Sequence, residues 1–254
     1  MQKANPEDGA ILARALDLVR IVSKSQQVQS TDFYDLYRCA MLQKALQYIP
    51  DIRLIVDGGY QEAERARVVI YPDYLITEEI NTGLAFLNIE GNFHFHKATH
   101  RNYLGALLSL GLRREKLGDI LVRENGAQLI SATEVAGYIN TNLTSVGQVN
   151  VTICEIERGD LKPPVHDYSA LKTTVQSLRL DSVAAHGFGL SRTKMMSAIN
   201  SGKIYLNWRL CLETSTHVNQ GDVISFRGRG RVILAKTDGV TKKGRITLLL
   251  HKYL

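Results

Sequence analysis

The sequence predicts an α+β protein made of three successive parts. Segments with helical spacing of apolar residues alternate with short strand-like segments along the 254 residues, which are enough for more than one hydrophobic core. The segment "RGDLKPPVHDYS" combines paired prolines with polar residues, which is typical of a linker. We therefore expect an N-terminal helix-plus-hairpin unit at 1–75, a central domain at 76–158, a linker at 159–170 and a C-terminal domain at 171–254.

The N-terminal part should contain two helices and a hairpin. Apolar residues recur at helical spacing from Pro6 to about Gln26. A second helix is expected to begin at the capping candidates Ser30 and Thr31 and to end before Pro50. The segments "IRLIVDGGY" and "RVVIYP" then predict two strands joined by a glycine turn.

The central part alternates strands and helices in a diagnostic order. A strand in "GLAFLNIEGNFHFHKA" precedes a helix in "THRNYLGALLSLGL", for which Thr99 is the expected cap. The segments "LGDILV" and "AQLIS" flank the turn "RENG", and a helix in "ATEVAGYINTNL" and a strand in "QVNVTICEIE" follow. This β-α-β-β-α-β order predicts a ferredoxin-like domain, which is also the arrangement of RRM-like domains, with both helices on one face of the sheet.

The C-terminal part should fold as two short helices followed by strands. The helices are expected at Leu180–His186 and Ser191–Ser201. Four strand-like segments follow them: "KIYLN", "DVISF", "RVILAK" and "RITLLLHK".

Positive charge is concentrated in the C-terminal part. Residues 171–254 contain 14 Lys and Arg against 4 Asp and Glu, whereas residues 1–170 contain 17 against 21. Clustered positive charge on a small domain indicates a polyanionic partner, and nucleic acid is the usual one.

The cysteine content and the hydropathy argue against a disulfide-rich protein and against a membrane or secreted protein. The three cysteines are far apart and form neither a disulfide framework nor a zinc half-site, which favours a reducing compartment. No apolar run approaches the roughly 20 residues needed to cross a bilayer, and the N-terminus lacks the layout of a secretory signal. We expect a cytoplasmic protein without membrane insertion.

The stretch "GLSRTKMMSAINSGKIYLNWR" combines core and surface signals. Ser191 is the expected N-cap of a helix whose first turn carries Arg192 and Lys194. Cations are unfavourable at a helix N-terminus unless an anion neutralises them, and a phosphate would do so. Met195 and Ile199 fall on the buried side of the same helix.

These motifs resemble the RNA-binding domain named after the fourth small-subunit ribosomal protein, here called the S-four domain. The resemblance extends from about Val175 to Arg231, and in that family the two helices and the following loop bind structured RNA, mainly through phosphates. The matching segments are "RLD" at 179–181, "SR" at 191–192, "INSGKIYLN" at 199–207 and "GDVISFRG" at 221–228.

Further recognisable segments are found along the chain. The C-terminal ones are "NW" at 207–208, "RGRGR" at 227–231 and "KKGR" at 242–245; the others are "GGYQEAER" at 58–65 and "HRNYLGALLSLGLRREKLGDI" at 100–120. Together these segments resemble the YlmH family over nearly the whole chain. Asn102 departs from the expected Asp. The resemblance implies binding to ribosomal RNA and, in some bacteria, ribosome quality control on stalled large subunits that hold peptidyl-tRNA. Cyanobacterial relatives carry a photosystem II label.

The predicted site consists of cations with polar and aromatic neighbours. The RNA-binding residues are predicted to be Arg179, Arg192, Lys194, Lys203, Tyr205, Asn207, Trp208, Arg209, Arg227, Arg229 and Arg231. A candidate second surface in the central domain comprises His100, Arg101, Arg113, Arg114 and Lys116. We expect a monomer that binds structured ribosomal RNA of the large subunit and also, as an option, tRNA, with no catalytic residue, metal or cofactor.

Other interpretations of the same segments remain open. The "RLD" triplet also surrounds the catalytic aspartate of pseudouridine synthases, and "LIVDGGY" imitates the first loop of a methyltransferase, so an RNA-modifying enzyme is the alternative. The histidines of "HFHKATH" have a spacing that a metal site could use. Phe93 and Phe95 could stack on bases, although core packing explains them equally well. A photosystem-associated adaptor is a weaker alternative.

Overall fold

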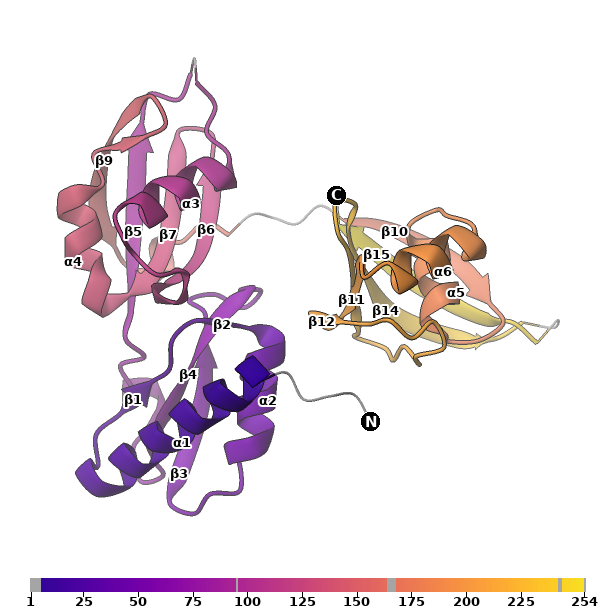
Figure 1. Cartoon of the computed structure of the whole chain (residues 1–254), viewed down its shortest axis with the longest axis horizontal. Helices are drawn as coiled ribbons and strands as arrows, with labels where there is room; N and C mark the ends of the chain where they lie inside the picture. The colour runs from indigo at the N-terminus through magenta and orange to yellow at the C-terminus, as the bar shows by residue number, and fades with distance from the viewer. Residues whose placement is uncertain (1–5, 95, 164–167, 242–243, 254) are drawn as a thin grey trace. The chain divides into compact units, whose positions relative to one another are not determined.

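The computed structural model describes residues 6–94, 96–163, 168–241 and 244–253. The chain divides into two compact units, Met1–Pro164 and Val165–Leu254, and each is described by itself (Figure 1). Helices and strands both contribute to each unit, so the predicted α+β class is confirmed. Among the described residues no helix combines the length and apolar character that crossing a bilayer requires.

The N-terminal part of the first unit packs two helices on a small sheet. Strand β4 is the centre of this sheet, because β1, β2 and β3 all pair with it in antiparallel fashion. Val22, Leu42, Val68 and Ile70 are fully buried between the helices and the sheet. The elements are α1 (Pro6–Ser25), β1 (Gln29–Ser30), β2 (Tyr34–Asp35), α2 (Leu36–Leu46), β3 (Ile52–Asp57) and β4 (Arg65–Pro72).

The second helix begins later than predicted. Asp35 is its N-cap, and an Oδ1 atom of this residue accepts the Arg38 backbone N–H at 2.9 Å. Ser30 lies in β1 instead, and the buried Thr31 hydroxyl accepts the Val68 backbone N–H at 3.0 Å. Ser30 and Thr31 therefore serve the sheet, because pairing with β4 satisfies this backbone better than an earlier helix start would.

The central part is a five-stranded antiparallel sheet with two helices on one face. The strand order β6-β7-β5-β9-β8 is that of a ferredoxin-like domain, with one short strand added at the edge. Leu87, Ile89, Tyr103 and Ile139 are buried between the sheet and the helices. The elements are η1 (Thr77–Glu79), β5 (Leu84–Gly91), α3 (His100–Ser109), η2 (Arg114–Lys116), β6 (Leu117–Arg123), β7 (Gly126–Ala132), α4 (Thr133–Asn142), β8 (Ser145–Val146) and β9 (Val149–Ile156).

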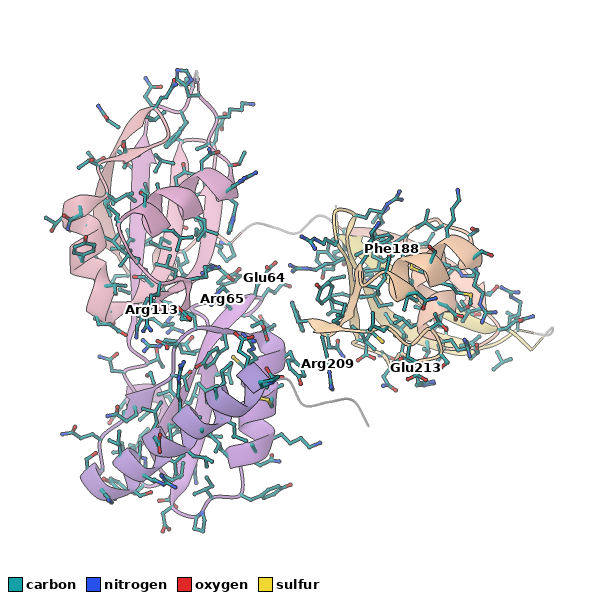
Figure 2. All side chains as sticks on the ribbon, in the orientation of Figure 1. Glu64, Arg65, Arg113, Phe188, Arg209 and Glu213 are labelled. Carbon is teal, nitrogen blue, oxygen red and sulfur yellow. The ribbon has the colours of Figure 1, made fainter. Side chains whose placement is uncertain are left out.

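A polar and apolar junction joins these two parts into one unit. Phe33 from the N-terminal part packs in one cluster with Phe86 and Ile130 of the central sheet. The Arg65 guanidinium donates to the carbonyls of Phe33, at 2.7 Å, and Leu117, at 3.1 Å. Arg65 lies at this junction with the neighbouring Glu64 and Arg113 (Figure 2).

A short 3₁₀ helix after the central sheet, η3 (Arg158–Asp160), contributes an ion pair to the junction. The Arg158 guanidinium binds both carboxylate oxygens of Asp57, at 3.1 and 2.5 Å. Burial alone would raise the pKa of Asp57, but hydrogen bonds from Arg158, Thr82 and the Gly59 backbone outweigh it and lower the pKa.

The C-terminal unit packs two helices on a six-stranded antiparallel sheet. Figure 1 shows the helices α5 and α6 with this sheet, whose strand order is β10-β15-β14-β13-β11-β12. Leu180, Met195, Ile199 and Leu250 are fully buried between the layers. The elements are β10 (Tyr168–Val175), α5 (Leu180–Gly187), α6 (Arg192–Asn200), β11 (Ile204–Leu206), β12 (Arg209–Leu210), β13 (Val223–Phe226), β14 (Gly230–Val240) and β15 (Ile246–Tyr253).

Strand β10 occupies part of the range predicted as a linker. It begins at Tyr168 and pairs with β15 over eight residues, from Tyr168 with Tyr253 to Val175 with Ile246. Its sequence, "YSALKTTV", lacks the apolar alternation that predicts a strand, and most of its residues are exposed. Its conformation comes from pairing with β15. The predicted linker residues 164–167 lie outside the described residues.

Replacing Arg158 by alanine is expected to destabilise the first compact unit. The buried Asp57 carboxylate would lose its charged partner, which lowers the unfolding free energy by about 1–3 kcal/mol. Urea unfolding followed by far-ultraviolet circular dichroism measures this, and Arg53→Ala removes an exposed arginine from β3 as the matched control. Trp208, the one tryptophan, reports on the C-terminal unit by fluorescence and should show no change. Equal stability of the two variants would contradict the role of Arg158.

Candidate nucleic-acid interface

A buried carboxylate, Asp181, holds two of the predicted RNA-binding arginines. Its side chain is 0% exposed, whereas those of Arg179 and Arg192 are 37% and 52% exposed. Arg179 donates to both oxygens of Asp181, at 3.2 and 3.1 Å. Arg192 donates twice to Oδ2, at 3.1 and 3.0 Å. The arginines of two different helix starts are thus oriented by one anion, and both retain exposed surface.

The local backbone places Asp181 where the two helices begin. Arg179 is the N-cap of α5, and Leu180 and Asp181 donate their backbone N–H groups to Thr216 and Thr214 at 2.8 and 3.1 Å. Burial alone would raise the pKa of Asp181, but hydrogen bonds from Arg179 and Arg192 outweigh it and lower the pKa. The carboxylate therefore stays charged at neutral pH.

The start of α6 agrees with its prediction, with one addition. Ser191 is the N-cap, and its hydroxyl accepts the Lys194 backbone N–H at 3.3 Å. The sequence requires an anion near Arg192 and Lys194, and the protein itself supplies one in Asp181. Lys194 is exposed in the same first turn. We call Arg179, Arg192 and Lys194 the helix-start cations.

A second group of cations lies beyond the other end of α6. Lys203 precedes β11, and its carbonyl accepts the Arg227 backbone N–H at 3.0 Å. Arg227 and Arg229 are exposed in the turn between β13 and β14, where Gly228 has φ +81°. The Arg229 guanidinium lies 5.5 Å from the centre of the Phe226 ring. We call Lys203, Arg227 and Arg229 the hairpin cations, and together with residues 201 and 202 they line a surface hollow.

The turn "NW" is a two-residue hairpin loop with an unusual backbone. Leu206 pairs with Arg209, and both turn residues have positive φ, +48° for Asn207 and +62° for Trp208. This geometry favours glycine at the second position, and a bulky residue in it is strained. The Trp208 indole N–H is buried, with no hydrogen-bond partner among the described residues. Trp208 is thus partly covered rather than fully open to a base.

The remaining predicted residues divide between structural and exposed positions. The Asn207 side chain donates to Asp222 at 2.8 Å and accepts the Val223 backbone N–H at 2.9 Å, so it holds the turn to β13. Arg209 is exposed on the edge strand β12 (Figure 2). Tyr205 lies on β11 and Arg231 on β14.

The candidate second surface does not form one exposed patch. His100 and Arg101 are exposed in the first turn of α3, and Arg113 is exposed before η2. Arg114 instead donates to the carbonyls of Leu117 and Gly118, and burial lowers its pKa to about 10.

Lys116 is also engaged inside the unit. Its ammonium lies 2.7 Å from Asp32 and 2.9 Å from Glu134, so it links the N-terminal part to α4. Arg114 and Lys116 are therefore already bound within the protein, and an RNA contact by His100, Arg101 and Arg113 stays a prediction.

The features behind the alternative interpretations have structural roles. A side chain at Gly58 would lie 2.4 Å from the Ala63 Cβ, and Gly59 has φ +93°, so the turn itself requires both glycines. Phe93 is buried against Tyr103, with ring centres 5.7 Å apart, so of the two interpretations left open for it the structure supports core packing. Phe95 lies outside the described residues.

The histidines of the possible metal site and Asn102 lie before or within the first turn of α3. Within the part of the chain that the structure describes, no three His, Cys, Asp or Glu residues are placed to hold a metal ion. Asn102 caps α3, because its Oδ1 accepts both the backbone N–H and the hydroxyl of Thr99, at 2.8 and 2.7 Å. Asn102 thus completes the capping box of Thr99, which is the N-cap of α3.

Comparison with known proteins identifies the family. Three family models match: "YlmH, N-terminal" at residues 7–75, "Putative RNA-binding domain in YlmH" at 78–160 and "S4 domain" at 178–224. The "Ribosome-associated protein quality control protein P2" of Bacillus subtilis (strain 168) is 35% identical over 244 residues, which cover 96% of this chain and 95% of that protein. The chain belongs to the YlmH family. The predicted resemblance is thus confirmed.

A solved structure supports the YlmH fold over part of the chain. The "Cell division protein ylmH from Streptococcus pneumoniae" has a TM-score of 0.53 and 24% identity, and the match covers 63% of this chain and 97% of that one. This likeness concerns the fold alone.

Asp181 is absent from the predicted RNA-binding residues, although it binds two of them, Arg179 and Arg192. Its acidic type in a basic domain was a signal, because a carboxylate directly at a helix start between two arginines suits an ion pair. Complete burial also separates it from any nucleotide, so the structure gives no support to a catalytic role for Asp181.

The variant Asp181→Asn should unfold more easily at neutral pH, by about 1–3 kcal/mol, because two arginines lose their charged acceptor. Since the pKa of Asp181 is lowered on folding, its stabilisation is complete above the unfolded pKa of about 3.9 and is lost as the pH falls through the lower folded pKa. Urea titrations followed by Trp208 fluorescence, at neutral pH and below about pH 4, measure both effects. A stability difference that does not shrink in acid would contradict this ion pair.

Proposed function

We propose that this protein is a non-catalytic RNA-binding protein that acts in ribosome-associated protein quality control. Its C-terminal unit binds structured ribosomal RNA of the large subunit in the cytoplasm, and tRNA on the same particle is a further candidate contact. The name of the Bacillus relative and the matching family models support the ribosomal partner. The observation that carries the proposal is the pair of arginines oriented by Asp181.

The two cation groups suit a phosphate backbone. They lie near opposite ends of α6, a helix of nine residues, which at about 1.5 Å per residue separates them by roughly 14 Å. Arginine binds a phosphate oxygen pair with two parallel N–H groups, and Arg179 and Arg192 are held in one orientation before RNA arrives. Less side-chain entropy is then lost on binding, so the contact is stronger.

A modifying enzyme targeted by the same domain is the competing function. The aspartate of "RLD" is buried, and the glycines of "LIVDGGY" are required by a tight turn, so neither feature favours catalysis. Thermal stabilisation by S-adenosylmethionine, or a modification missing from the RNA of a deletion strain, would overturn the non-catalytic proposal.

The double variant Lys194→Glu, Lys203→Glu should abolish binding to a structured ribosomal RNA fragment without unfolding the protein. Both lysines are exposed, so the substitution leaves the Arg192–Asp181 pair intact. If about five cations contact phosphates, log affinity should fall with log salt concentration at a slope of about −4 in the wild type. Fluorescence anisotropy at several salt concentrations measures this, and Lys44→Glu, Arg53→Glu is a control of equal charge in the first unit. Unchanged binding in the Lys194, Lys203 variant would contradict the proposed face.

Sedimentation tests the cellular partner. The wild-type protein should travel with free large subunits in a sucrose gradient of cell lysate, and the Lys194, Lys203 variant should remain at the top. Sedimentation with small subunits or with neither particle would overturn the large-subunit proposal. Co-fractionation with membranes that survives ribonuclease would favour an adaptor role instead.

A further inference from the structure

The C-terminal sheet has a second face, away from α5 and α6. Ile224, Leu234, Leu248 and Leu250 are buried in one cluster with residues of α5 and α6, so they lie on the helix side of the sheet. Successive side chains of a strand point to opposite faces, so their neighbours in the strands point away from the helices. We call this side the outer face, and the predicted contact residues Tyr205 and Arg231 lie on it.

Strand register aligns aromatic and cationic residues in one row across the outer face. The pairs are Tyr168 with Tyr253, Tyr253 with Arg231, Arg231 with Ser225, and Ser225 with Tyr205. Neighbouring strands lie about 4.8 Å apart, so the row extends over roughly 19 Å. Three tyrosines, an arginine and a serine, one from each of five strands, thus share one line.

The rings at one end of this row form a cluster with an open side. Tyr168 stacks on His251, with ring centres 4.0 Å apart and planes inclined by 18°, and it lies 6.1 Å from the Tyr253 ring. Tyr168 is 50% exposed on the edge strand β10, so its ring can also contact a ligand.

Cations lie two rows further along the same face. Lys172 and Lys236 both pair in register with Leu249, and both are exposed. Asp238 forms an ion pair with Lys236 at 2.7 Å. Among the described residues the outer face thus carries Lys172, Lys236 and Arg231 together with aromatic rings, and Lys236 is paired with Asp238.

We propose that the outer face binds unpaired RNA nucleotides, with bases stacked on the Tyr168 cluster and phosphates beside Lys172, Arg231 and Lys236. Exposed rings next to cations on an open sheet suit single-stranded nucleic acid, because a base must leave its helix to expose a π face. In the central domain the described phenylalanines Phe86 and Phe93 are buried and offer no such open ring. The inference rests on the proposed function only in taking RNA as the ligand.

The two faces of the C-terminal unit then have different ligands. The helix-start and hairpin cations contact the phosphates of a folded RNA, whereas the outer face captures an adjoining unpaired segment. RNA binding by each face can be abolished by substitutions that leave the other face unchanged. Two RNA probes therefore distinguish the two faces.

The test uses the full-length protein with two fluorescein-labelled RNAs, an oligouridylate and a fully paired hairpin stem. Tyr168→Ala should weaken oligouridylate binding on the order of tenfold, the usual effect of losing one stacked base, and leave the stem unaffected. Tyr168→Phe keeps the ring and should bind as the wild type does. Lys172→Glu should also weaken oligouridylate binding, whereas Lys194→Glu, Lys203→Glu should lose the stem and retain the oligouridylate.

The results with the two RNAs test the outer face and the proposed function separately. Equal oligouridylate affinity in the wild type and in Tyr168→Ala, or no oligouridylate binding by the wild type, would overturn the outer face as an RNA site and leave a protein as its occupant. Stem binding that survives the Lys194, Lys203 substitutions would count against the helix-side interface alone. Circular dichroism and Trp208 fluorescence confirm that each variant is folded.

Discussion

The ion pair of Asp181 with Arg179 and Arg192 is the interaction on which the C-terminal surface depends. A carboxylate with no exposed surface remains charged only because two guanidinium groups bind it. The same contacts restrict those groups to one orientation at the starts of two helices. The same ion pairs therefore stabilise the buried charge of Asp181 and fix the orientation of two partly exposed guanidinium groups.

In the first compact unit, Arg65 and Arg158 bind groups inside the protein. Arg65 donates to main-chain carbonyls of both of its parts, and Arg158 spans from the end of the central sheet to Asp57. Burial lowers the pKa of Arg65, yet the guanidinium stays charged because its ordinary pKa is so high. Arginine thus joins the two parts within this unit, whereas in the C-terminal unit Arg179 and Arg192 keep part of their side chains exposed.

Local signals explain which elements could be predicted. Ser191 and Thr99 were recognised as helix caps because capping depends on residues within one turn. The later start of α2 and the strand β10 could not be predicted, because both depend on pairing with strands distant in sequence. Thr31 looks like a cap by residue type, and only the adjacent Val68 shows that its hydroxyl serves a sheet.

The sequence by itself determined the α+β class, the order of the central strands, the basic C-terminal domain and its membership of the YlmH family, since composition, periodicity and short motifs are local properties. Only the tertiary structure decided which cations are exposed, because Lys116 and Lys194 look alike until their neighbours are known. It alone also aligned Tyr168 with Tyr205 across five strands. Register between strands far apart in the chain is decided by the packing of a shared core, and no single segment encodes it.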